Sequence, residues 1–309
     1  MNLDHLFERE LVVVMGKGGV GRSSLTAALA LSAGQRGKRT LIVEMGGCRD
    51  VAQYLGLAGR SYAPRPWRAG VDLASLTPAE CLEDFGRRKL RTGALLKKVL
   101  NNRVSRAFLE AVPGLHDLLQ LGKVENLLSE PLPTDTRYDL VVLDAPATGH
   151  GLTLLSAART LADLTRIGPF HDLATIISGF LSDRERTALV LATLPEDLPV
   201  QESLELRASL QADGADLAAV VVNRLLSSPV PDPQAWPHVR EALTRAGSPW
   251  AEGAEHVERA VLAHRQQQAL LTRLADTVAP TPLFSVFNSP LEPHSDRLDA
   301  MAADLGEAP

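Results

Sequence analysis

A glycine-rich segment near the N-terminus constrains the fold more than any other feature of the chain. It reads Gly16, Lys17, Gly18, Gly19, Val20, Gly21, Arg22, Ser23 and Ser24. An apolar run over residues 11–15 precedes it, and a helix-length stretch over residues 23–36 follows it. Between a strand and a helix, consecutive backbone N–H groups can surround phosphate oxygens, and the helix adds the positive end of its dipole. The segment therefore predicts a phosphate-binding P-loop rather than a plain glycine-rich turn.

A second motif supplies the expected metal ligands. Residues 138–144 read as a buried strand that ends in Asp144, which is typical of a Walker B motif. The Ser23 hydroxyl is placed to coordinate a Mg²⁺ ion that bridges the β- and γ-phosphates of ATP, and Asp144 is placed to hold the same ion. We therefore predict Mg²⁺ and ATP or ADP as cofactors, with Ser23 and Asp144 on the metal. A purely structural acid at the strand end is the alternative.

The P-loop departs from the usual pattern at Arg22. That pattern has a lysine before the serine or threonine, and the lysine ammonium reaches the β- and γ-phosphates. Arginine keeps the charge but replaces a compact ammonium by a planar fork on a longer arm. We expect phosphate binding to survive this change and hydrolysis to be weakened.

Short apolar runs alternate with helical stretches along most of the chain. The runs cover residues 11–15, 40–43, 71–76, 139–143, 187–193, 217–222 and 282–286. This alternation predicts right-handed βαβ crossovers, and thus an α/β fold with a doubly wound, mostly parallel sheet. We interpret residues 1–309 as a single domain. Residues 78–137 and 150–186 are too long for simple crossovers, so they are predicted to be helical insertions that lie beyond the strand ends.

Two motifs together resemble those of a known family. Lys17 directly after Gly16 gives a variant P-loop shared by a group of dimeric ATPases, and residues 144–151 resemble the Asp-Thr-Ala-Pro-Thr-Gly-His signature of the ArsA and tail-anchored-protein targeting ATPases. The resemblance covers most of residues 11–223. It implies a nucleotide-dependent dimer, formed either by two copies of the chain or with an ArsA-like paralogue.

The resemblance also implies roles for individual residues. Lys17 would reach across a dimer interface to the partner's phosphates. His150 would belong to a switch that senses the γ-phosphate, although a lone histidine of this kind is more often a core residue. Asn223 matches a strand-end asparagine whose amide pairs with the adenine edge, and Glu202 lies in a stretch similar to the family's Glu-Thr segment.

One catalytic position of the family is missing. Where the family has an aspartate that positions the attacking water, this chain has Gly46, so either Glu44 or Asp50 replaces that carboxylate or the function is lost. With Arg22, this departure predicts an ATPase of reduced activity that pairs with a catalytically intact paralogue. Two alternatives remain open: a pseudo-ATPase subunit that binds nucleotide as a switch or scaffold, and a spatial-positioning ATPase resembling MinD and ParA.

A basic stretch over residues 87–106 is interleaved with leucine and valine and contains no acidic residue. It predicts an amphipathic helix. Two interpretations are open: a solvated face that covers the sheet, or a surface that docks an anionic membrane or a protein client.

Composition excludes several other classes. The net charge of -5 argues against a nucleic-acid-binding protein. The chain has only two cysteines, Cys48 and Cys81, in unlike contexts, so neither a zinc clasp nor an arsenite-binding cysteine triad is expected. The first residues lack the basic and apolar regions of a signal peptide, and no apolar run approaches the length of a membrane span. These features predict a cytoplasmic protein.

Overall fold

The computed structural model describes residues 3–46, 50–89, 114–131, 137–145, 150–288 and 294–306. Within these residues the strands are β1 (Leu11–Met15), β2 (Thr40–Glu44), β3 (Arg65–Pro66), β4 (Val71–Ser75), β5 (Leu140–Asp144), β6 (Thr187–Thr193), β7 (Ala219–Leu225) and β8 (Leu283–Phe287). They form one sheet in the order β3-β4-β2-β5-β1-β6-β7-β8. Every neighbouring pair is parallel except β3 with β4.

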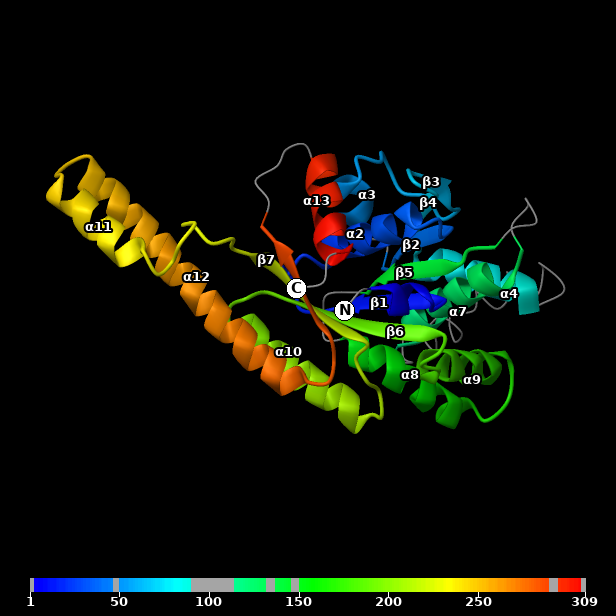
Figure 1. Cartoon of the computed structure of the whole chain (residues 1–309). Helices are drawn as coiled ribbons and strands as arrows, with labels where there is room; N and C mark the ends of the chain where they lie inside the picture. The colour runs from blue at the N-terminus through cyan, green and yellow to red at the C-terminus, as the bar shows by residue number, and fades with distance from the viewer. Residues whose placement is uncertain are drawn as a thin grey trace.

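Helices connect these strands and cover both faces of the sheet (Figure 1). They are α1 (Asp4–Phe7), α2 (Arg22–Gln35), α3 (Asp50–Tyr54), α4 (Pro78–Lys89), α7 (Leu115–Ser129), α8 (His150–Thr165), α9 (Pro169–Ser182), α10 (Asp197–Ala212), α11 (Trp236–Arg245), α12 (Trp250–Val278) and α13 (His294–Gly306). This arrangement confirms the predicted α/β architecture with a mostly parallel sheet.

The central strands bring the two sequence motifs together. β1, β2 and β5 are buried along their whole length, as expected for parallel strands that are covered on both faces. β5 lies between β1 and β2, and Asp144 pairs with Val14 on one side and with Glu44 on the other. Because parallel strands end at the same edge of a sheet, the P-loop, Asp144 and Glu44 all lie at that edge.

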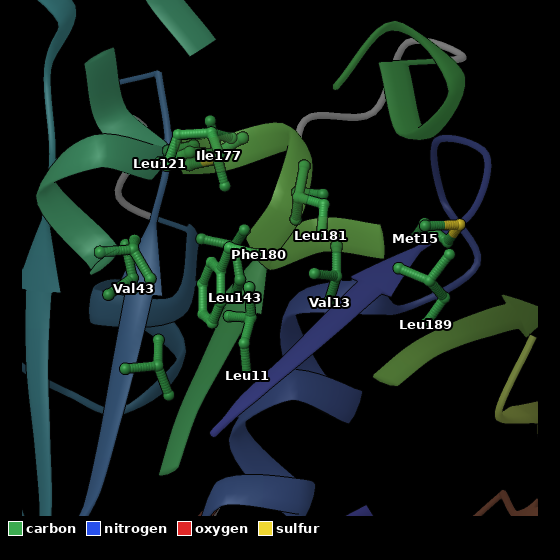
Figure 2. Close-up of a cluster of buried hydrophobic side chains, with 14 of the residues drawn as sticks. Leu11, Val13, Met15, Val43, Leu121, Leu143, Ile177, Phe180, Leu181 and Leu189 are labelled. Atoms are coloured by element: carbon green, nitrogen blue, oxygen red, sulfur yellow. The ribbon is translucent and has the colours of Figure 1, made fainter. Parts of the chain in front are cut away.

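Two apolar layers hold the helices to the sheet. On one face, Leu25 and Leu29 of α2 pack in a cluster that also contains residues of α1 and α13. On the other face, α7 and α9 pack directly over the central strands. Figure 2 shows Phe180 of α9 beside Leu143 and Leu11 of the strands.

The position of the predicted insertions differs from the expectation. Where the structure describes residues 78–137 and 150–186, most of them lie in the helices α4, α7, α8 and α9. However, α7 and α9 lie on the face of the sheet rather than beyond the strand ends. The reason is that their apolar sides can be buried against the strands, where each large apolar side chain contributes about 1.5–3 kcal/mol.

The helical hairpin of α11 and the adjoining part of α12 extends away from the sheet (Figure 1). It has a small apolar cluster of its own, formed by Val230, Trp236, Ala254 and Val261. None of the helices in the described ranges combines the length and the apolar content needed to cross a bilayer.

Candidate functional site

The P-loop connects β1 to α2 at the carboxyl edge of the sheet. Lys17, Gly18 and Gly19 are exposed, whereas the Val20 side chain is buried in the core beneath the loop. α2 begins with Gly21 as its N-cap, and no side chain caps its first turn. The first backbone N–H groups of a helix have no partner within the helix, so here they are left for a ligand. The loop therefore has the strand-loop-helix geometry that an anion site requires, and phosphate binding by it stays a prediction.

Asn223 of β7 holds this loop. Its amide nitrogen donates to the Val20 carbonyl at 2.9 Å, and its amide oxygen accepts from the Arg224 backbone N–H at 2.9 Å. A Cβ atom on Gly21 would lie 2.2 Å from the Asn223 amide nitrogen, so only glycine fits there. The predicted contact of Asn223 with adenine would require this amide to exchange or share its partners, and it stays a prediction.

Ser23 and Asp144 lie in direct contact at the start of α2 and the end of β5. The Ser23 hydroxyl donates to Oδ2 of Asp144 at 2.7 Å, while the buried Oδ1 of Asp144 has no hydrogen-bond partner. An unpartnered buried carboxylate oxygen is costly, and a hydrated cation would satisfy it. A hydroxyl and a carboxylate side by side are also the oxygen ligands that Mg²⁺ prefers. The residues present therefore fit the predicted metal.

Electrostatics at Asp144 favour the same conclusion. Burial, with a smaller contribution from the nearby carboxylates of Glu44 and Asp50, raises the pKa of Asp144 to about 6. The hydrogen bond from Ser23 and the charge of Arg22 oppose this rise in pKa. Negative charge is thus in excess around Asp144, and a divalent cation would relieve it. Among the described residues, no group of three or more His, Cys, Asp or Glu gathers in a metal-binding arrangement.

Arg22 does not point into open space above the loop. Its guanidinium donates a hydrogen bond to the carbonyl of Ala145, the residue that follows Asp144. This contact links the first residue of α2 to the segment after β5. Residues 146–149 lie outside the described residues, as does the side chain of His150, whose backbone begins α8. The predicted role of His150 as a switch residue therefore stays a prediction.

Lys17 forms an ion pair with α10. Its ammonium lies 3.4 Å from a carboxylate oxygen of Glu202, and the two side chains are 47% and 29% exposed. Exposed pairs of this kind contribute only about 0–1 kcal/mol, so the pair does not fix Lys17 strongly. Lys17 is consequently available to another ligand or to a second chain.

Glu44 has a different environment from the one expected of a catalytic base. Its side chain is 1% exposed, and Oε1 accepts hydrogen bonds from the backbone N–H groups of Val51 and Ala52 at 2.7 and 3.2 Å. The other oxygen, Oε2, accepts from the Ser75 hydroxyl at 2.6 Å. Glu44 thus caps α3 and ties it to β4. Its proposed role toward the attacking water stays untested, and this geometry favours a structural role instead.

Two replacements distinguish these roles of Glu44. In Glu44→Gln, the amide oxygen can still accept from the α3 backbone and the Ser75 hydroxyl can turn to accept from the amide nitrogen, so turnover and stability are expected to change little. Glu44→Ala leaves three buried donors without partners and is expected to lower the free energy of unfolding by about 2–4 kcal/mol. Urea unfolding and ATP turnover measure both. A large loss of turnover in a stable Glu44→Gln protein would instead make Glu44 catalytic.

The comparisons with known proteins agree with this geometry. A family model described as anion-transporting ATPase matches residues 9–170, which include the P-loop and Asp144. The chain belongs to the ArsA family of anion-transporting ATPases. It is 32% identical to ATPase BagA of Mycobacterium tuberculosis (strain ATCC 25618 / H37Rv), over 69% of this chain and 64% of that protein.

More distant relatives carry ArsA-type names as well. The chain is 26% identical to an arsenical pump-driving ATPase of Acidiphilium multivorum, over 74% of this chain and 42% of that protein. It is 22% identical to ATPase ASNA1 homolog 1 of Paramecium tetraurelia, over 70% of this chain and 74% of that protein. The match covers 64% of the length of each mycobacterial relative. The activity and the partners of this ArsA-family chain are therefore proposals.

Proposed function

We propose that this ArsA-family chain binds Mg²⁺ and ATP and acts as a nucleotide-dependent dimeric switch with weakened hydrolysis. The observation that carries the proposal is the pair of Ser23 and Asp144, with its unpartnered carboxylate oxygen, beside a helix whose first turn lacks a side-chain cap. When bound, Mg²⁺ would neutralise phosphate charge. Ser23 and Asp144 would hold it, and the P-loop amides would hold the phosphates.

Three features of the chain support weakened hydrolysis. Gly46 carries no carboxylate for the attacking water, and Glu44 already accepts three hydrogen bonds. Arg22 donates to the Ala145 carbonyl rather than pointing into the loop. We therefore keep the second candidate, a pseudo-ATPase subunit that binds nucleotide without hydrolysing it at a useful rate. Membership of the ArsA family disfavours the alternative of a positioning ATPase resembling MinD and ParA.

Restoring the usual lysine is expected to raise turnover. In Arg22→Lys, a compact ammonium can contact the β- and γ-phosphates more closely than the guanidinium can. ATP turnover by the purified chain should therefore rise by about tenfold or more. Arg36→Lys makes the same replacement at the far end of α2 and should leave turnover unchanged. If the unmodified chain already turns over as fast as intact relatives and Arg22→Lys gains nothing, weakened hydrolysis is wrong.

The proposed partners are a second copy of the chain or an intact ArsA-like paralogue. The half-exposed Lys17 supports a role across such a dimer. Docking of an anionic membrane or a protein client through residues 87–106 also stays a proposal, because only residues 87–89 of that stretch are described. There, Arg87 pairs with Glu83 at 2.5 Å, and Arg88 pairs with Asp84 and Glu130. These two arginines are therefore part of local ion pairs.

A further inference from the structure

Gln120 is a polar residue in an otherwise apolar part of α7. Its neighbours Leu119 and Leu121 belong to the core, and Gln120 itself is 1% exposed. The amide oxygen accepts from the backbone N–H of Gly46 at 2.7 Å, and the amide nitrogen donates to the His116 carbonyl at 3.1 Å. Burying an amide is costly unless it is hydrogen-bonded. The contact with Gly46 thus fixes α7 to the segment that follows β2.

Gly46 lies next to the candidate metal site. It comes two residues after Glu44, which pairs in register with Asp144 across the neighbouring strands. Asp50, at the start of α3, lies close enough to Asp144 for its charge to help raise the pKa of Asp144. Gly46 and Asp50 therefore both lie beside the residues that would bind Mg²⁺ and phosphate.

Gly46 and the start of α3 are held by different parts of the fold. At the α3 end, Glu44 accepts from the Val51 and Ala52 amides, so this anchor belongs to the sheet. At the Gly46 end, Gln120 is the anchor, and it belongs to a helix of the 78–137 insertion. Since β2 is fixed in the centre of the sheet, a movement of Gly46 toward bound nucleotide either breaks the bond to Gln120 or shifts α7.

α7 is in turn packed tightly against its neighbours. A Cβ atom on Gly122 would lie 2.6 Å from a methyl carbon of Leu173, so the absence of a side chain brings α7 and α9 into close contact. Lys123 forms an ion pair with Asp84 of α4 at 3.0 Å. Figure 2 shows Leu121 beside Ile177 of α9. A closely packed interior transmits displacement, so a shift of α7 is passed to α4 and α9.

We propose that Gln120 is a positioning residue that couples the nucleotide-dependent position of Gly46 to the helices α4, α7 and α9. This coupling rests on the proposed nucleotide binding and adds a route separate from the one expected through His150. Nucleotide binding that moves Gly46 changes the stability of α7 locally, and a change in α4 or α9 changes nucleotide affinity in return, because coupling between two sites is reciprocal.

Hydrogen exchange of the full chain, with and without Mg²⁺ and ATP, tests this coupling. When nucleotide binds to the unmodified chain, the amide exchange rates of peptides from α7 and α9 are expected to change about fivefold, in either direction. In Gln120→Met, which keeps the size but not the hydrogen bonds, that response should fall to less than about twofold, with ATP affinity within about threefold of the unmodified chain. Gln120→Asn, whose amide is one methylene short of Gly46, gives the same test if the methionine variant does not fold.

Asn126→Leu is the matched control on the same helix. The Asn126 amide donates only to the Gly122 carbonyl within α7, so its loss should leave the nucleotide response of α7 and α9 intact. The coupling is overturned if nucleotide binds without altering exchange in α7 and α9, if Gln120→Met keeps the response, or if Asn126→Leu loses it equally. Absence of ATP binding, measured in parallel by calorimetry, would overturn the proposed nucleotide binding instead.

Discussion

Asp144→Asn is expected to lower Mg²⁺-dependent ATP turnover by about 100-fold or more while making the nucleotide-free protein more stable. Turnover falls because an amide is a poor substitute for the carboxylate that would hold the metal beside Ser23. Stability rises because the ionised carboxylate is 9% exposed and one of its oxygens has no partner. Burial raises the pKa of Asp144 from 3.8 to about 6, so ionisation in the folded chain costs about 3 kcal/mol.

The gain in stability should depend on pH in a defined direction. An acid whose pKa is higher in the folded state than in the unfolded state stabilises the fold fully below about pH 4, and this contribution is lost as the pH rises through about 6. Asp144→Asn should therefore unfold at a higher temperature than the unmodified chain at pH 8 and lose that advantage at pH 4. Thermal unfolding by circular dichroism, without nucleotide or Mg²⁺, measures the difference.

Asp139→Asn is the control for this variant. Asp139 precedes the opposite end of the same strand, where its carboxylate accepts from the Arg39 backbone N–H at 2.8 Å. Turnover should be unaffected there because the residues proposed above to bind phosphate and metal lie at the opposite edge of the sheet. Mg²⁺-dependent turnover that survives in Asp144→Asn would mean that the metal is held elsewhere.

Lys17→Ala is expected to lower ATP turnover by about 10³-fold or more and to leave ATP affinity nearly unchanged. A cation supplied across an interface stabilises the transition-state charge and contributes about 10³ to 10⁵ in rate for an arginine finger. Lys17 suits that role because it is exposed, and its pair with Glu202 is weak enough to be replaced. Lys38→Ala, in the loop between α2 and β2, removes a lysine far from the site and should be neutral.

Mixing two inactive variants tests whether Lys17 acts across a dimer. In a dimer of one Lys17→Ala chain and one Asp144→Asn chain, one site keeps its own Asp144 and receives Lys17 from the other chain. Random mixing should then restore about a quarter of the turnover of the unmodified protein, because half of the dimers carry one working site. If light scattering shows dimers in the mixture and no turnover returns, Lys17 acts within its own chain.

Seven of the eight strands in the described residues were predictable because each is a short apolar run bounded by turn residues, whereas the two-residue β3 was not predicted. β1 and β6 have the predicted bounds, whereas β7 begins at Ala219 instead of residue 217 and continues to Leu225. The P-loop was equally predictable, since its geometry depends on a strand, a glycine run and a helix that are adjacent in sequence. The position of Asp144 at the end of a buried strand was predictable for the same reason. The register of β1 with β5 then brings Asp144 into contact with Ser23.

The remaining contacts join distant parts of the chain, and local patterns do not encode them. Glu44 was one candidate for the carboxylate near the attacking water, and the sequence pattern did not reveal that the backbone of α3 and Ser75 of β4 surround it with donors. Gln120 was missed because its partner Gly46 lies 74 residues earlier. One signal for it was available: a glutamine within a leucine-rich helical run is unusual in a core and calls for a polar partner.

Equilibrium titration of the purified chain with ATP, in the presence and absence of Mg²⁺, tests the proposed function most directly. One nucleotide should bind per chain, more tightly with Mg²⁺ than without it, and the effect of Mg²⁺ should disappear in Asp144→Asn but persist in Asp139→Asn. Failure of the folded chain to bind ATP at millimolar concentration with Mg²⁺ present would contradict a nucleotide site built on Ser23 and Asp144.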